Sequence, residues 1–244
     1  MIMKFPLLPK KDVICGIANF ECPDLGKIDV IKVYKNKNIS SPVSSHADVN
    51  VCYIGNGDVF VACEQQHLAQ ELEKLGLNVI SIKKEMNNDY PSDSLLNVAV
   101  FGNTAILNPK TVCDELLNAL KNRNFKIIEV NQGYSKCSIL PVSDNAIITT
   151  DRVISDKCKQ NEIDALLVTT DGICLNGYDC GFIGGCGGLI SKDKMLFFGD
   201  IDKHPDSDKI CEFLNNYNIK VIKTSGDLTD YGSFIPIFEI SNEP

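Results

Sequence analysis

A pattern of strand, turn, strand, helix and strand recurs along this chain, and it limits the fold more than any other feature of the sequence. The first copy, "NVCYIGNGDVFVACEQQHLAQELEKLGLNVISI", begins at Asn50. Two short apolar runs flank a Gly-Asn-Gly turn, and Leu68, Leu72 and Leu75 follow at helical spacing. The second copy begins at Asn97 and repeats the same order, with Gly-Asn again at the turn. Each copy therefore predicts one β-β-α-β unit.

Two further copies and one divided copy complete the pattern. The third begins at Cys137, with Asp151 placed to cap its helix, and the fourth begins at Gly187. A last strand starts near Gly232, and the N-terminal runs "DVICGIA" and "KIDVIKVY" supply strands that complete this fifth unit. Repeat starts near 50, 97, 137, 187 and 232 give a period of roughly 40 to 50 residues, which is typical of a solenoid, a propeller or another closed array.

The divided fifth unit favours a closed ring. A solenoid needs polar end caps, whereas a unit shared by the two termini closes a ring and hides most sheet edges. We therefore predict an α/β propeller of five β-β-α-β units, formed by residues 1–244 as a single domain. The alternative is an ordinary three-layer α/β protein in which this order of elements happens to recur.

The composition limits the kinds of partner. A net charge of −8 without any basic run argues against a nucleic-acid groove or an anionic membrane surface, and it favours a cationic or neutral small molecule. The chain has no apolar run long enough to cross a membrane, and its N-terminus is too polar for a signal peptide, so we expect a cytoplasmic protein. Exposed helix faces are compatible with a homodimer.

The eleven cysteines do not form a recognisable metal or redox motif. No two of them are separated by two residues, the spacing of zinc ribbons and thioredoxins, and the cluster "CLNGYDCGFIGGC" lacks nearby histidines. We expect most of these thiols to be buried and reduced. The run "GFIGGCGG" enters a strand and is not followed by Gly-Lys-Ser/Thr, so it predicts a tight turn that lines the channel, not a nucleotide loop.

The predicted ring resembles the pentein fold of the guanidino-group-modifying enzymes. The segments "SSHADVNV", "YPSDSLLNVAVFGN", "NQGYSKCSI", "AIITTD" and "GYDCGFIGGCGG" are more closely similar to an uncharacterised bacterial family of that fold. The resemblance covers about residues 40 to 240. It implies amidinotransferase-like or hydrolase chemistry, although this fold also includes non-enzymatic members.

The resemblance also implies a set of catalytic groups. Pentein enzymes combine a His-x-Asp element and further carboxylates with a nucleophilic cysteine near the C-terminus. Here His46-Ala47-Asp48 matches the His-x-Asp motif, although it lies in an earlier unit than in those enzymes. The segment "DLTDYGSFIPI" corresponds to the cysteine region, but it carries Gly232 and Ser233 in place of a cysteine. This departure leaves the enzymatic activity open.

In a closed ring, the residues that lead into the first strand of each unit converge at one end of the channel. We expect His46 and Asp48 to share one face of a strand, where the carboxylate orients the imidazole. We expect Cys137 to be the nucleophile, with Lys136 beside it to lower the pKa of its thiol, and Cys186 is its rival. The predicted substrate-binding residues are Asp93, Asn97, Gln132, Lys136, Asp179, Cys186, Asp230 and Ser233. His67 and His204 are interpreted as surface residues.

These residues support a hydrolase or transferase that acts on a guanidino- or amidino-like cation. His46 would be the general acid/base and a cysteine the nucleophile, without any cofactor or metal. The alternative is a non-catalytic pentein-fold protein that binds an unknown ligand. A third interpretation is a metal-dependent hydrolase that uses His46, Asp48 and other carboxylates.

Overall fold

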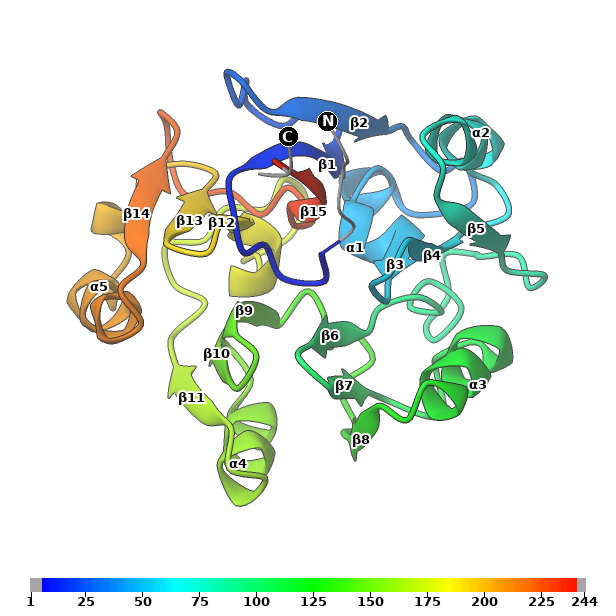
Figure 1. Ribbon diagram of the computed structural model, residues 1–244. Coiled ribbons are helices and arrows are strands. Elements are labelled where there is room, and N and C mark those ends of the chain that lie inside the picture. Colours follow the sequence, from blue (N-terminus) through cyan, green and yellow to red (C-terminus); the bar gives the residue numbers. More distant parts are fainter. Residues whose placement is uncertain (1–5, 241–244) are drawn as a thin grey trace.

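The computed structural model describes residues 6–240, which form five three-stranded sheets arranged as blades around a central axis (Figure 1). In every sheet the middle strand pairs antiparallel with the inner strand and parallel with the outer strand. The divided blade consists of β15 (Ile235–Glu239), β1 (Val13–Asn19) and β2 (Asp29–Val33). The predicted five-fold propeller, closed by strands from both ends of the chain, is therefore confirmed.

The other four blades are continuous in sequence. Their inner strands are β3 (Val51–Tyr53), β6 (Ala99–Phe101), β9 (Ile139–Ser143) and β12 (Gly187–Ser191). Their middle strands are β4 (Asp58–Val61), β7 (Thr104–Leu107), β10 (Ala146–Thr149) and β13 (Lys194–Phe197). The helices that follow are α2 (Gln66–Lys74), α3 (Asp114–Asn122), α4 (Arg152–Gln160) and α5 (Ser207–Asn216), and they lie at the outside of the ring (Figure 1). The outer strands are β5 (Asn78–Ser81), β8 (Lys126–Glu129), β11 (Asp164–Leu167) and β14 (Lys220–Lys223).

The helices form where the apolar spacing predicts them, but one leucine of a predicted helical stripe and one histidine lie in other surroundings than expected. Leu68 and Leu72 are buried on α2, but Leu75 follows the last helical turn and is 41% exposed. Asp151 caps α4 as predicted, since its Oδ1 accepts a hydrogen bond from the Ile154 amide at 2.9 Å. The surface interpretation of His204 is wrong: its ring is buried between the Thr169 carbonyl and the Asp206 amide.

The apolar core lies between neighbouring blades. One cluster joins the blades of β3 and β6, where Phe60 and Leu107 are buried, and another joins the blades of β9 and β12, where Ile148 and Phe197 are buried. Each blade thus covers the apolar face of the next one, which explains why a single unit would not be stable alone.

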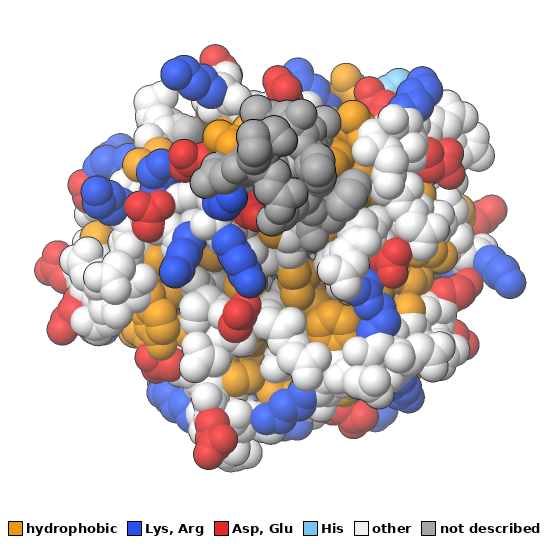
Figure 2. Space-filling model, viewed as in Figure 1, with side chains coloured by type: hydrophobic (Ala, Val, Ile, Leu, Met, Phe, Trp, Pro, Cys, Tyr) orange, Lys and Arg blue, Asp and Glu red, His pale blue; other side chains and the backbone are white. Residues whose placement is uncertain are grey.

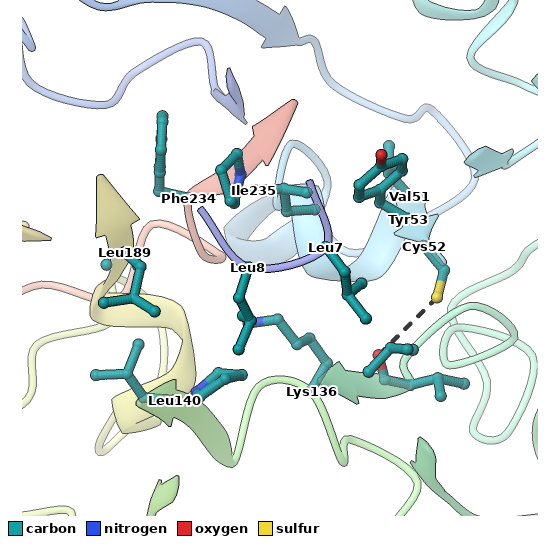
Figure 3. Close-up of a pocket in the computed structure, with 16 residues that line it drawn as sticks. Leu7, Leu8, Val51, Cys52, Tyr53, Lys136, Leu140, Leu189, Phe234 and Ile235 are labelled. Atoms are coloured by element: carbon teal, nitrogen blue, oxygen red, sulfur yellow. Dashed lines mark hydrogen bonds between the residues drawn. The ribbon is translucent and has the colours of Figure 1, made fainter. Parts of the chain in front are cut away.

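An N-terminal segment closes one end of the ring. Leu7 packs against the clusters formed by the divided blade and the blades of β3 and β6, and Leu8 packs against those formed by the blades of β6, β9 and β12. The carboxylate of Glu239 on β15 fixes this segment by accepting hydrogen bonds from the Lys10 and Lys11 amides at 2.7 and 3.0 Å. Figure 3 shows Leu7, Leu8 and Lys136 grouped among side chains of the inner strands. The space between them is only about 50 Å³, enough for a few water molecules.

On the face seen in Figure 2, acidic and basic side chains are interspersed around the rim, and apolar side chains are visible near the middle. Among residues 6–240, the structure has no helix that is both long and apolar enough to span a bilayer.

Candidate active site

The residues that lead into the five inner strands meet at the other end of the ring. His46 precedes a short helix, α1 (Ala47–Asn50), and Asn97 lies two residues before β6. Lys136 and Cys137 lie in the turn before β9. A 3₁₀ turn over Ile183–Cys186 leads into β12, and residues 230–233 lead into β15. The predicted convergence is therefore observed, and it brings together most of the predicted site residues: His46, Asp48, Asn97, Lys136, Cys137, Cys186, Asp230 and Ser233.

His46 lies between two buried carboxylates. Its Nδ1 is 3.7 Å from Asp230 Oδ1 and 3.9 Å from Asp48 Oδ1, and all three side chains are nearly inaccessible to solvent. The expectation that His46 and Asp48 lie on one strand face is wrong, because Asp48 is in the first turn of α1. The helical turn still brings the carboxylate near the imidazole, but the second carboxylate comes from the opposite end of the sequence.

The carboxyl of Asp230 is held in a strongly desolvating position. Burial raises its pKa to about 6, the nearby imidazole of His46 opposes this change, and the negative charge of Asp48 adds to it. Both carboxylate oxygens accept backbone hydrogen bonds, Oδ2 from Phe182 and Oδ1 from Gly232, each at 2.9 Å. A carboxyl with a pKa near neutrality is suited to proton transfer at physiological pH.

Asp48 is connected to Lys136 through the hydroxyl of Ser233. Ser233 Oγ lies 2.9 Å from Asp48 Oδ2, and Lys136 Nζ lies 2.8 Å from the same Oγ. The second oxygen of Asp48, Oδ1, is buried and has no hydrogen-bond partner. Burial lowers the pKa of the Lys136 amine, although the charges of Asp48 and Cys137 oppose that change. Lys136 thus lines the central cavity, and its amine reaches a polar cluster formed by His46, Asp48, Asp230 and Ser233.

The two candidate thiols lie in surroundings that disfavour thiolates. Burial, followed by the charges of Asp48 and Asp230, raises the pKa of Cys137 well above its ordinary range. Burial and the same two carboxylates also raise the pKa of Cys186. Lys136 favours the Cys137 thiolate, as predicted from the sequence, but its effect is smaller than that of the carboxylates.

Asn97 organises the centre of the site. Its Nδ2 donates to the Asp48 carbonyl at 3.0 Å and to Cys137 Sγ at 2.9 Å. Its Oδ1 accepts from the amides of Lys136 and Cys137 at 2.7 and 3.2 Å. One buried amide therefore joins three lead-in segments. These contacts position the segments of the site, and the substrate-binding role of Asn97 stays a prediction.

The glycines of "GFIGGCGG" allow the lead-in segments to approach each other. A Cβ on Gly185 would lie 1.7 Å from Asp230 Oδ1, and a Cβ on Gly184 would lie 2.3 to 2.5 Å from three backbone carbonyls, two in the turn before β9 and one at the first residue of β9. Gly232 has φ +81°, and a Cβ there would overlap His46. The prediction of a tight turn at this run agrees with these contacts.

Three predicted residues lie outside the polar cluster. Gln132 contacts Asp151 and the Tyr134 amide, and Asp179 is exposed. Asp93 accepts a short hydrogen bond from the hydroxyl of Tyr134, and burial raises the pKa of this carboxyl. No sequence pattern indicates a role for Tyr134, since a single tyrosine in a loop has no characteristic spacing.

No group of three or more histidine, cysteine or carboxylate side chains within residues 6–240 has an arrangement suited to a metal ion. The described part of the chain therefore provides no assembled centre for the metal-dependent interpretation.

Several solved structures are similar to this chain, and they include an amidinotransferase, an agmatine deiminase and a DDAH. An amidinotransferase of saxitoxin biosynthesis from Microseira wollei is 10% identical and superposes with a TM-score of 0.55, over 92% of this chain and 91% of that one. The agmatine deiminase of C. jejuni is 10% identical, with a TM-score of 0.53 over 92% and 90% of the two chains. The DDAH of Pseudomonas aeruginosa, solved as a cysteine-to-serine mutant with citrulline, is 10% identical, with a TM-score of 0.56 over 89% and 92%.

At this identity the likeness shows the fold alone, and that fold is the pentein propeller. No curated protein matches the sequence. A family model does match, over residues 24–235, which is most of the chain. This pentein-fold protein therefore belongs to the family of unknown function DUF6873.

Proposed function

We propose that this protein binds a guanidino- or amidino-like cation at the cluster of Asp48, His46 and Asp230, and that it acts on this cation as a hydrolase or transferase. His46 is the general acid/base in this proposal, and the two carboxylates hold the cationic nitrogens. Support comes from the fold, since the similar structures include an amidinotransferase and an agmatine deiminase.

The observation that carries the proposal is the free oxygen of Asp48. A buried carboxylate oxygen without a hydrogen bond is costly, because its desolvation is not repaid. Oδ1 of Asp48 is such an oxygen, and it lies on the side of the carboxylate that faces His46. An amidinium group carries planar N–H donors with a positive charge, and it would supply the missing hydrogen bond.

The raised pKa values of Cys137 and Cys186 favour the second candidate function, a pentein-fold protein that binds its ligand without chemistry. A related observation is that a cysteine-to-serine mutant of C. jejuni agmatine deiminase was solved with substrate bound. Cys137 remains a candidate nucleophile only if ligand binding lowers the pKa of its thiol, as a nearby cation would do.

Asp48→Asn is expected to weaken binding of the cation at least tenfold, because the change removes the negative charge but keeps the shape of the side chain. Calorimetric titration with agmatine, methylguanidine and acetamidine measures the affinity of the wild type and the variant. Asp171→Asn, which neutralises an exposed carboxylate outside the site, is the matched control. Failure of all three cations to bind the wild type, or an equal loss in both variants, would contradict the proposal.

A further inference from the structure

The hydroxyl of Ser233 lies against the amine of Lys136, with Oγ and Nζ 2.8 Å apart. We propose that Ser233 is the nucleophile of this site and that Lys136 is its general base. This inference rests on the proposed function, and it assigns the covalent step to a serine instead of a cysteine.

The backbone of Ser233 is held in an uncommon conformation. Its φ is +73°, which lies in the left-handed region that non-glycine residues rarely adopt. The residue is fully buried, and its Oγ contacts the Gly184 carbonyl at 2.6 Å and Asp48 Oδ2 at 2.9 Å. Strained residues of this kind persist where the surrounding structure fixes them, and they are concentrated at functional sites.

Lys136 has the properties of a lysine base. Its stem lies beside the apolar side chains of the central cavity, including Leu140 and Ile235, and the amine emerges at the polar cluster. Burial lowers the pKa of this amine, so the neutral form that can accept a proton becomes accessible closer to neutral pH.

The contrast with Cys137 favours the serine. Cys137 Sγ faces the amide nitrogen of Asn97, which donates a hydrogen bond and cannot take a proton. Ser233 Oγ accepts a hydrogen bond from the Lys136 amine at 2.8 Å, and a neutral amine at this distance can instead take the hydroxyl proton. Ser233 also lies two residues before β15, in a lead-in segment that meets the other polar residues of the site.

The reaction balances as a hydrolysis. Neutral Lys136 accepts the hydroxyl proton of Ser233 while Oγ bonds to the central carbon of the guanidinium. His46, the general acid/base of the proposed function, then gives a proton to the leaving nitrogen, the carbon–nitrogen bond breaks, and an amine departs. A water molecule next attacks the O-linked carbon and gives a proton to His46. The Lys136 ammonium returns its proton to Oγ as the carbon–Oγ bond breaks, and a urea is released. The extra proton of the guanidinium leaves with the amine as an ammonium ion, and nothing is oxidised or reduced.

Methanesulfonyl fluoride is a small electrophile that tests the nucleophile directly. Ser233 Oγ bonds to its sulfur, fluoride leaves, and the hydroxyl proton passes to Lys136. Peptide mass spectrometry is expected to find the sulfonyl group on Ser233 in the wild type and to find none there in Ser233→Ala. Ser225→Ala, which removes an exposed serine outside the site, is expected to be modified like the wild type.

The variant Lys136→Arg distinguishes two roles of Lys136, that of a base that accepts a proton and that of a structural counter-ion to Asp48. Arginine keeps a positive charge beside Asp48 but does not deprotonate, so the rate of modification is expected to fall at least tenfold. In the wild type the rate should rise with pH as Lys136 deprotonates, whereas in Lys136→Arg it should stay flat. Lys136→Met, checked for folding by circular dichroism, should show the same loss.

Two outcomes would overturn the serine–lysine pair: a wild type that is not modified at Ser233, or a rate unchanged in both Lys136 variants. Agmatine titration of the wild type tests the proposed function separately. Binding without modification rejects the pair alone, whereas modification without binding supports the pair and rejects the guanidino ligand.

Discussion

Gly184→Ala is expected to lower the free energy of unfolding by about 3 kcal/mol or more, at the upper end of what overpacking costs. The new methyl carbon would lie 2.3 Å from the Lys136 carbonyl oxygen, 2.4 Å from that of Ile139 and 2.5 Å from that of Cys137. All three contacts are with backbone, so no side-chain rotation relieves them. The 3₁₀ turn and the turn before β9 must move apart instead. Thermal unfolding should show a fall in Tm of about 6–12 °C for a chain of this size.

Gly26→Ala is the matched control for this change. Gly26 has φ +67° but no atom within 4 Å of the added carbon, so its substitution tests backbone strain without overlap. Its cost should be about 1 kcal/mol. Equal losses of stability in the two variants would show that steric overlap at Gly184 is not the cause. The displacement in Gly184→Ala should also disturb Ser233, whose Oγ contacts the Gly184 carbonyl.

The ring could be predicted from the sequence because its signals are local. The predicted starts at residues 50, 97, 137, 187 and 232 lie within three residues of the inner strands, which begin at Val51, Ala99, Ile139, Gly187 and Ile235. An apolar run, a two- or three-residue turn and a helical stripe are each encoded over a few neighbouring residues. Closure followed from the division of one unit between the two ends of the chain.

The partners within the site could not be predicted in the same way. The ring geometry predicted that His46 and Ser233 meet at one end, but not that Lys136 contacts Ser233 or that Asp230 approaches His46. These contacts depend on the short helix α1, the left-handed backbone of Ser233 and the close approach of Gly185. Each of these features places segments that are distant in sequence within a few ångströms of one another, and no local sequence pattern encodes such a distance.

The cysteines show how burial changes a prediction made from residue type. Lys136 next to Cys137 in sequence indicates a stabilised thiolate, which requires that the lysine charge dominate. In the folded chain burial raises the pKa of the same thiol, and the charges of two carboxylates from other blades raise it further. The lysine amine instead contacts Ser233. The arrangement of the segments that lead into the inner strands therefore determines the pKa of this thiol more than its neighbour in sequence does.

Asp230 is expected to make the protein less stable as the pH rises from 4 to 7. Burial raises the pKa of its carboxyl to about 6 in the folded chain, from an ordinary value of 3.8. The folded state therefore binds this proton more tightly than the unfolded state does. The resulting stabilisation is complete below about pH 4 and is lost as the pH passes through 6. A shift of about two units corresponds to about 3 kcal/mol.

Urea unfolding of the wild type and of Asp230→Asn at several pH values measures this contribution. The variant cannot titrate at this position, so the difference in the free energy of unfolding between the two proteins should change by about 3 kcal/mol between pH 4 and pH 7. The change should be smaller in an Asp48→Asn background, because the charge of Asp48 is one cause of the raised pKa of Asp230. A difference that stays constant with pH would mean that the carboxyl is ionised throughout this range. The His46 imidazole and the backbone donors of Phe182 and Gly232 would then outweigh its burial.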